Sequence, residues 1–484
     1  MRSRRRKKRR YSRLPVVAVI LTAAVAALAA LYTVRQKPMD LAGGEKQSLV
    51  GKESSEPEEQ KAEQKQKEPV LETMRATEAV QETEPVTEQN PAELPSSYDI
   101  RDHRTVTVSD QGDLGTCWAF AALKAVETSM PGSMAVPLSA DHMSIHNSFR
   151  ISQNSGGDYS MAMAYLLAWQ GPVPETEDPY GDSTSPDGLE PVCHVQEIRI
   201  LPGKDYDAVK RAVFRYGGVQ TSIYLPSENR GGDGNVCYKG SEEPNHDTVI
   251  IGWDDAYPRE RFSSAPESDG AFLCVNSWGE SFGDGGFFHV SYEDSRIAES
   301  GITYCGIESA ENYDQNYQSD LCGWTGQMGF GEPEAWMTNV YTAKSDETLE
   351  AVGFYATAPD TEYEVYVFEG DSFREHVENN EKFQTDSGKV LASGVLTDTG
   401  FYTVSLEKPW ILDAGEIFAV TVRIRTQGMT QPVAVEYAGS GRTGNVDISD
   451  GEGYISFDGS VWERTETSKG CNVCLKAYSR KKGK

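Results

Sequence analysis

The chain has 484 residues, enough for two or three domains of ordinary size, and 38% of them are hydrophobic, which suffices for a core. The formal net charge is −28, but nine of the 46 basic residues lie within Met1–Arg13, so the remainder carries 37 basic against 74 acidic residues. Such an acidic chain is a poor candidate for a nucleic-acid-binding protein, and no nucleic-acid partner is predicted. Eight cysteines are too few for a disulfide-rich scaffold.

The N-terminus combines a basic segment, residues 1–13, with an uncharged apolar stretch, Leu14–Val34. As a helix, this stretch spans roughly 31 Å, the thickness of the hydrocarbon core of a bilayer. The basic flank orients the N-terminus towards the cytoplasm, so the pattern predicts a single-pass signal-anchor over residues 14–34, a membrane partner and an extracellular remainder. The alternative is a signal peptide cleaved near the small residues 27–29, in which case the protein is secreted.

Residues 35–93 are predicted to form a disordered, acidic spacer. Not one aromatic residue occurs from Thr33 to Ser97, and Glu, Gln, Lys, Thr and Pro dominate. Such a composition cannot bury enough apolar surface to offset the entropy of ordering the chain. The spacer would therefore hold a folded head away from the membrane, and we expect order to begin at Leu94.

Two folded blocks are predicted beyond the spacer. Residues 94–310 mix helical and strand patterns, whereas residues 318–482 are dominated by short strand patterns separated by Gly, Asp, Pro and Thr. The segment Ser309–Ser319 is predicted to link them. The expected fold class is α+β, with an all-β sandwich as the second block. Its strand patterns are Glu350–Ala356, Glu362–Phe368, Gly400–Ser405, Ile417–Arg425, Val433–Tyr437 and Val473–Tyr478.

Cys117 is the first candidate for chemistry, in the segment QGDLGTCWAFAALKAVETSM. The apolar residues after it are spaced as in a helix, which Pro131-Gly132 terminates. The thiol therefore lies at or near a helix N-terminus, where the aligned peptide dipoles lower a thiol's pKa and favour the nucleophilic thiolate. A Cys beside Trp118 in an apolar stretch is nevertheless more often part of a core.

Two further polar residues complete a set that can perform nucleophilic catalysis. His246 opens a strand-like run from Thr248 to Trp253, and Asn276 follows the apolar strand Ala271–Val275. Each taken alone is readily explained as turn chemistry. Together with a thiol they supply a nucleophile, a base that takes its proton and a group that orients the base.

These motifs resemble the papain-like cysteine peptidase family. The resemblance rests on QGDLGTCWAF, on NHD before a strand and on NSWG with its Gly-rich sequel, and covers roughly Leu94 to Ala310. It implies a fold of one helical and one β-barrel-like half, with the site between them. His246 lies 129 residues and Asn276 159 residues after Cys117. The family typically has about 130–150 residues, so the second spacing is slightly long.

The resemblance assigns a role to each matching position. Cys117 is similar to the nucleophile, His246 to the general acid and base, and Asn276 to the residue that orients the imidazole. Gln111 matches the glutamine whose side-chain amide, with the backbone N–H of Cys117, donates to the oxyanion of the tetrahedral intermediate. This chemistry needs no metal and no cofactor, and none is predicted.

Three more positions are predicted to shape the substrate site. Trp278 resembles the tryptophan that shields the Asn–His hydrogen bond from water, and Gly156 with Gly157 resembles the glycine pair along which extended substrate backbone lies. A turn at the start of a helix explains the two glycines equally well. Leu114 departs from the family pattern, which has a half-cystine there, and residues 33–97 lack the apolar residues of an inhibitory pro-segment.

The other seven cysteines carry no assigned chemistry. Cys274 is expected in the core, and Cys193 with Cys237 forms a pair that the sequence leaves open. Cys471 and Cys474 form a CxxC motif, for which zinc or redox function is the less favoured interpretation.

The second block resembles the lectin-like β-sandwich that follows the peptidase domain in some bacterial surface proteins. The resemblance implies a cell-surface glycan as partner, or docking against the peptidase. Fold analogy does not establish a ligand, and core packing is the default for tryptophans in a β-sandwich. The tryptophans that can stack on sugar rings are Trp324, Trp336, Trp410 and Trp462.

The sequence thus predicts a membrane-tethered, extracellular cysteine peptidase with peptide or protein substrates. The first alternative is a surface adhesin or glycan-binding protein in which the peptidase domain serves as scaffold. The second is acyl transfer onto an amine by the same residues.

Overall fold

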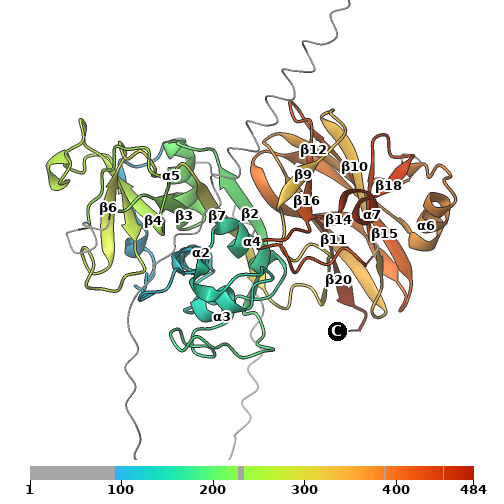
Figure 1. The fold of residues 1–484 in the computed structure, drawn as a ribbon, viewed down its shortest axis with the longest axis horizontal. Coiled ribbons are helices and arrows are strands. Elements are labelled where there is room, and N and C mark those ends of the chain that lie inside the picture. The colour runs from blue at the N-terminus through green and yellow to red at the C-terminus, as the bar shows by residue number, and fades with distance from the viewer. Residues whose placement is uncertain (1–92, 227–233, 386–387, 451, 484) are drawn as a thin grey trace, which may run out of the picture. The chain divides into compact units, whose positions relative to one another are not determined.

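The computed structural model describes residues 93–226, 234–385, 388–450 and 452–483 (Figure 1). The predicted basic segment, signal-anchor and nearly all of the spacer lie outside these residues. Within the described ranges, no helix is long and apolar enough to cross a membrane.

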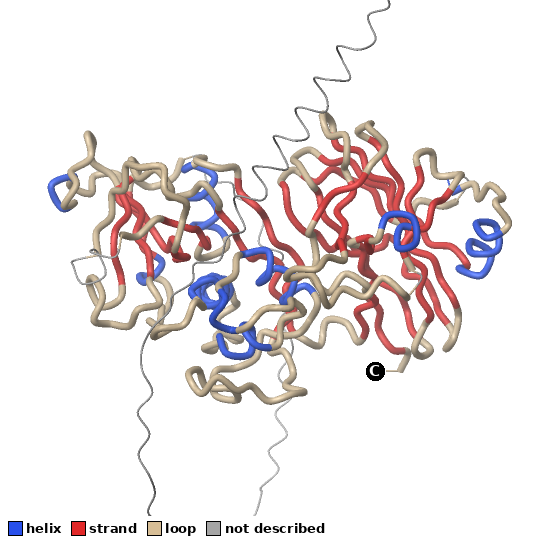
Figure 2. The backbone as a smooth tube through the Cα atoms, viewed as in Figure 1, coloured by secondary structure: helices blue, strands red, loops and turns tan. Residues whose placement is uncertain are grey.

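The first block contains helices and strands, as predicted. Figure 2 shows α2, α3 and α4 gathered on one side of its strands. Its helices are α2 (Cys117–Ser129), α3 (Ala140–Ile145), α4 (Tyr159–Leu167) and α5 (Tyr206–Arg215), with single 3₁₀ turns at Ile100–Asp102, Gln153–Ser155 and Arg259–Arg261. Its strands are β1 (Ser97–Asp99), β2 (Cys193–Leu201), β3 (Val219–Ile223), β4 (His246–Asp254), β5 (Ala271–Val275), β6 (Phe287–Ser291) and β7 (Gly301–Ser309).

The second block is dominated by strands, and every strand predicted there coincides with an observed one except the last. Its strands are β8 (Gln315–Tyr317), β9 (Gly326–Met328), β10 (Glu334–Thr342), β11 (Glu347–Ala356), β12 (Thr361–Glu369), β13 (Ala392–Leu396), β14 (Thr399–Leu412), β15 (Ile417–Thr426), β16 (Val433–Tyr437), β17 (Gly453–Ser456), β18 (Trp462–Arg464), β19 (Cys471–Val473) and β20 (Leu475–Lys481). Two helices accompany them, α6 (Gly370–Glu378) and α7 (Thr465–Lys469).

The predicted strand Val473–Tyr478 is interrupted at Cys474. The Cys474 N–H donates to Ala434 O at 3.1 Å, while β19 pairs with β16 and β20 pairs with β11. The chain therefore changes from one sheet to another at this residue. The sequence cannot show such a change, because both strands are buried and their residues form one continuous, largely apolar run.

One sheet runs through both blocks, in the strand order β6-β5-β4-β3-β7-β2-β14-β11-β20-β8. The two blocks join where β2 pairs antiparallel with β14, Arg199 opposite Gly400. Gly400 has φ +154°, and a Cβ there would lie 2.1 Å from Ile198 O, so the close approach of the strands requires glycine. The second block also has a six-stranded sheet, β13-β12-β15-β10-β17-β18, and a three-stranded sheet, β19-β16-β9.

The helix that carries Cys117 is embedded in the core. Ten of the thirteen residues of α2 are buried, and the same apolar cluster includes α4 and part of β4. Residues of the second block, among them Tyr355, Phe401 and Ala434, belong to this cluster as well. Burial on this scale, at about 25 cal/mol per Å² of apolar surface, fixes α2 against both blocks.

Candidate active site

Cys117 is the first residue of α2, as predicted, and is partly exposed. Its sulfur lies against the backbone N–H groups of Cys117, Trp118 and Asp247, which lower the pKa of the thiol. Burial and the negative charge of Asp247 act in the opposite direction and prevail, so the pKa is raised to about 11. The start of the helix thus lowers the pKa of the thiol, as expected, but burial outweighs this effect. At neutral pH the thiol needs a base.

His246 is the first residue of β4, next to Asp247, whose backbone N–H faces the Cys117 sulfur. Its Nε2 lies 2.7 Å from Oδ1 of Asn276, which follows the last residue of β5. The same oxygen accepts the N–H of Ser277 at 2.7 Å, which fixes the orientation of the Asn276 amide. An oxygen can only accept, so Nε2 carries the proton and Nδ1 is the basic nitrogen of the neutral ring.

Trp278 covers this hydrogen bond. Its ring centroid lies 4.5 Å from that of His246, with the planes inclined at 36°, and both His246 and Asn276 are buried. Phe282 packs edge-on against the Trp278 ring, with the ring centroids 5.1 Å apart, and so supports it. A hollow of about 210 Å³ opens beside Trp278, lined by Asp110, Gly112, Ser281 and Phe282.

Gln111 is buried, and its side chain is held in one orientation. The Ser277 hydroxyl donates to Gln111 Oε1 at 2.7 Å, and Gln111 Nε2 donates to Leu114 O at 2.7 Å. The backbone of Gln111 is fixed as well, since its N–H donates to Ser277 O at 2.8 Å. An amide nitrogen has two hydrogens, and the bond to Leu114 uses one of them.

Gly156 and Gly157 lie beside the nucleophile. Gly156 has φ +74°, a conformation that favours glycine. A Cβ on Gly157 would lie 2.6 Å from the Trp118 indole, so only glycine fits there. The structure thus places all seven predicted site residues around the start of α2, on β4 and after β5; their roles stay predictions.

Sequence reasoning missed Asp247. Its carboxylate accepts from Ser222 Oγ at 2.6 Å and from Gln220 Nε2 at 3.1 Å, and Gln220 Oε1 accepts from the Tyr304 hydroxyl at 2.8 Å. Burial raises the pKa of Asp247 to about 6, against the lowering effect of these hydrogen bonds. The residue stands directly after His246, but its partners come from β3 and β7, which the sequence does not pair with it.

Tyr180 and Ser277 were missed too. The Tyr180 hydroxyl donates to Gln111 O at 3.0 Å and lies 2.7 Å from the hydroxyl of Thr116, which is fully buried. These contacts fix the loop between Gln111 and Cys117, where a half-cystine is absent. The NSWG motif, which contains Ser277, could have indicated this residue. No sequence pattern around Tyr180, which lies in a loop, could have indicated its role.

All eight cysteines are free, which resolves the pairing of Cys193 with Cys237 that the sequence left open. Cys274 is fully buried, as predicted. Among the described residues, no group of three or more His, Cys, Asp or Glu side chains is arranged to hold a metal ion. The site is therefore made of a thiol, an imidazole and two amides, a set suited to acyl transfer.

Comparison with protein families gives two matches. Residues 94–314 match the family described as papain family cysteine protease, and residues 316–479 match the lectin like domain. Cysteine protease Amb a 11.0101 of Ambrosia artemisiifolia is 27% identical over 209 residues, 42% of this chain and 51% of its own length. Cathepsin L of Sarcophaga peregrina is 26% identical over 238 residues, 46% of this chain and 63% of its own length. The chain thus spans between half and two thirds of these relatives.

Two solved structures resemble both blocks. The clostridial cysteine protease Cwp84 after propeptide cleavage gives a TM-score of 0.71 at 25% identity, covering 80% of this chain and 100% of that one. The cysteine protease and lectin-like domains of Cwp84, a surface layer associated protein of Clostridium difficile, give a TM-score of 0.69 at 25% identity, covering 80% of this chain and 89% of that one.

Proposed function

Because residues 94–314 are a papain family cysteine protease domain and residues 316–479 a lectin like domain, we propose that this protein hydrolyses peptide bonds through Cys117, His246 and Asn276. The observation that carries the proposal is the hydrogen bond from His246 Nε2 to Asn276 Oδ1, beside a thiol that begins a helix. This bond leaves Nδ1 as the base for a thiol whose raised pKa requires one.

In the proposed mechanism, Cys117 Sγ attacks the scissile carbonyl carbon as His246 Nδ1 takes its proton. The oxyanion accepts hydrogen bonds from the Cys117 N–H and from the second hydrogen of Gln111 Nε2. The intermediate collapses as the imidazolium gives its proton to the leaving amine, which yields a thioester. Water, deprotonated by His246, then hydrolyses the thioester and releases the acid.

The test is covalent labelling and hydrolysis by the described part of the chain, expressed from Leu94 onwards. A thiol-directed epoxide is expected to label Cys117 and to stop cleavage of peptide amides, while Cys117→Ala neither labels nor cleaves. Absence of both labelling and cleavage under reducing conditions would contradict the proposal. Transfer of the acyl group to an added amine in preference to water would instead identify an acyl transferase.

A membrane-tethered, extracellular location is part of the proposal. Its support is the sequence alone: the basic segment 1–13 before the apolar stretch Leu14–Val34. Proteolytic shaving of intact cells should remove the peptidase domain and leave the N-terminal segment in the membrane fraction. A protein that resists shaving until the cells are broken would contradict this location.

Glycan binding by the second domain is a further candidate, and an exposed aromatic pair favours it. Trp336 and Trp462 are buried, so they do not serve as surface platforms, whereas Phe330 and Phe457 are exposed with ring centroids 5.8 Å apart. Aromatic faces of this kind can stack on sugar rings. Binding of the wild-type ectodomain, the chain from Leu94 onwards, to a glycan array would support a glycan partner if Phe457→Ala abolishes the binding. Absence of binding to any glycan on the array would contradict a glycan partner. Array binding with an unreactive Cys117 would point to the adhesin.

A further inference from the structure

The segment Asn154–Asp158 contacts the residues on either side of the nucleophile. Asn154 Oδ1 accepts the N–H of Gly115, two residues before Cys117, at 2.9 Å. Gly157 packs on the Trp118 indole with no room for a Cβ. Any displacement of this segment therefore changes the surroundings of Cys117 on this side.

Arg442, from the lectin like domain, holds the end of this segment. Its Nη1 lies 2.5 Å from Asp158 Oδ2, while Asp158 Oδ1 accepts the Ser160 N–H at 2.9 Å and so caps α4. The backbone carbonyl of Arg442 accepts the Arg150 N–H at 2.7 Å, and its guanidinium lies 5.6 Å from the Phe149 ring centroid. One residue of the second domain thus contacts both flanks of the segment.

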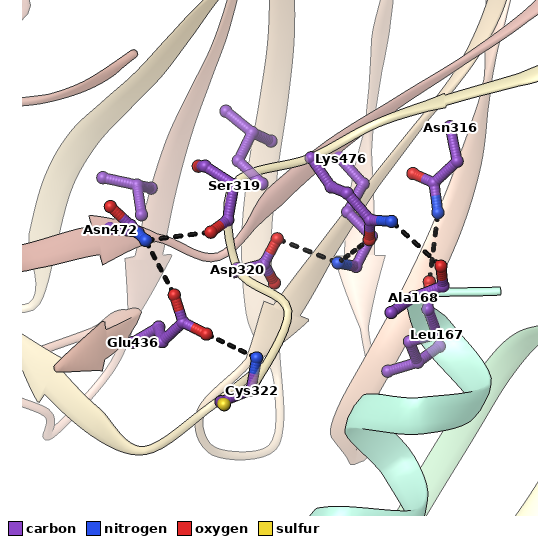
Figure 3. Close-up of polar contacts among 12 residues, drawn as sticks. Leu167, Ala168, Asn316, Ser319, Asp320, Cys322, Glu436, Asn472 and Lys476 are labelled. Carbon is purple, nitrogen blue, oxygen red and sulfur yellow. Dashed lines mark hydrogen bonds and ion pairs between the residues drawn. The ribbon is translucent and has the colours of Figure 1, made fainter. Parts of the chain in front are cut away.

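The other end of α4 is also held by residues beyond the first domain (Figure 3). Asn316 Nδ2 donates to Leu167 O at 3.2 Å, and Gln318 Nε2 donates to Ala168 O at 2.9 Å, which satisfies carbonyls that a helix end leaves unpaired. Lys476 Nζ donates to Gln318 Oε1 at 2.7 Å and so fixes the Gln318 side chain. The same Nζ forms an ion pair with Asp320 Oδ1 at 2.8 Å.

The ion pairs at the two ends of α4 differ in how far their side chains are exposed to solvent. The Lys476 and Asp320 side chains are 1% and 0% exposed, whereas those of Arg442 and Asp158 are 45% and 42% exposed. Removing one partner of a buried pair is strongly destabilising, whereas a half-exposed pair contributes little to overall stability. The Arg442 contact can therefore be removed without unfolding the protein.

We propose that Arg442 of the lectin like domain is a positioning residue for peptide binding, acting through Asp158 on the Gly156–Gly157 segment. The inference rests on the proposed function, because it assumes that substrate backbone lies along these glycines. With the contact broken, the segment must be ordered by the substrate itself, which weakens binding. Peptide affinity is then set partly by a domain outside the peptidase domain.

The test compares Arg442→Ala with Arg425→Ala in the ectodomain. Arg425 is a matched control, because its side chain is 46% exposed and pairs with Glu362 inside the second domain. With a peptide amide that extends three residues before the scissile bond, Arg442→Ala is expected to raise KM about three- to tenfold with kcat within about twofold. Arg442→Lys should recover part of the loss, and Arg425→Ala should leave KM unchanged.

Two readouts separate this inference from the proposed function. Alkylation of Cys117 by iodoacetamide should proceed at the wild-type rate in Arg442→Ala, because the contact acts on the substrate segment. Asp158→Asn keeps a capping side chain but loses the charge, so its rise in KM should not add to that of Arg442→Ala. Equal KM values for Arg442→Ala and Arg425→Ala, or additive effects of the pair, would overturn the inference while wild-type cleavage still supports the function. A wild-type protein that cleaves no peptide would overturn both.

Discussion

His246→Ala is expected to lower peptide turnover at pH 7 by on the order of 10³–10⁴. The reason lies in the thiol. Burial and the charge of Asp247 raise the pKa of Cys117 to about 11, so without the imidazole only about 10⁻⁴ of the thiol is ionised at pH 7. A thiol is a far weaker nucleophile than a thiolate, and the variant lacks the imidazole that takes the proton.

The pH dependence of alkylation checks the reason separately from turnover. In His246→Ala, the rate of reaction with iodoacetamide should rise about tenfold per pH unit from neutral pH up to the raised pKa, because the thiolate fraction does so. In the wild type the rate should be higher near pH 7 and depend less steeply on pH, because His246 Nδ1 takes the proton as the thiol reacts. The other seven cysteines are buried, so alkylation of the native protein reports Cys117. His103→Ala, at an exposed imidazole stacked on Tyr98, is the control and should behave as the wild type. A wild-type pH profile in His246→Ala would show that another group accepts the proton.

The positions of Cys117, His246 and Asn276 were predictable because each lies at the end of a strongly patterned element. The helical spacing after Cys117 and the apolar run Ala271–Val275 place the start of α2 and the end of β5 at the residues observed. Local patterns determine where elements begin and end, and the side chains at those ends follow. Gln111, in the loop before α2, was predicted only through the resemblance to the papain-like family, because no local pattern singles it out.

The surroundings of the site were not predictable, because they depend on which strands pair. Asp247 is a polar residue inside a strand pattern, and its environment comes from Gln220 and Ser222 on β3. Those partners lower the pKa of Asp247, whose negative charge adds to burial in raising the pKa of the neighbouring thiol. Periodicity reports that a segment is a strand, but it contains no information about the partner strand.

The same limit applies to the junction of the two domains. The pairing of Arg199 with Gly400 joins residues 201 positions apart, and Arg442 reaches Asp158 across 284 positions. The sequence predicted two blocks joined by a linker and left docking between them open, whereas the structure has one sheet and one apolar cluster that include both. Contacts of this range depend on the complete fold, so the contact of Arg442 with Asp158 emerged only from the structure.

Gln111→Ala is expected to lower kcat by about 10²–10³, with a much smaller change in KM. The amide would donate to an oxyanion that exists only in the tetrahedral intermediate and its transition states, so its loss affects the chemical step more than substrate binding. Gln111→Glu should be equally inactive, because an ionised carboxylate cannot donate and repels the oxyanion. Ser277→Ala removes the hydroxyl that orients the amide at 2.7 Å, and a smaller loss of about three- to tenfold is expected.

Alkylation of Cys117 distinguishes an oxyanion donor from a merely structural residue. Reaction with iodoacetamide is a displacement at carbon that forms no oxyanion, so Gln111→Ala should alkylate at close to the wild-type rate while peptide turnover collapses. Gln111 also donates to Leu114 O, three residues before the nucleophile, and through that bond it can stabilise the loop. If alkylation and turnover fall by the same factor, the glutamine acts by holding Cys117 in place, and the oxyanion is stabilised by backbone N–H groups alone.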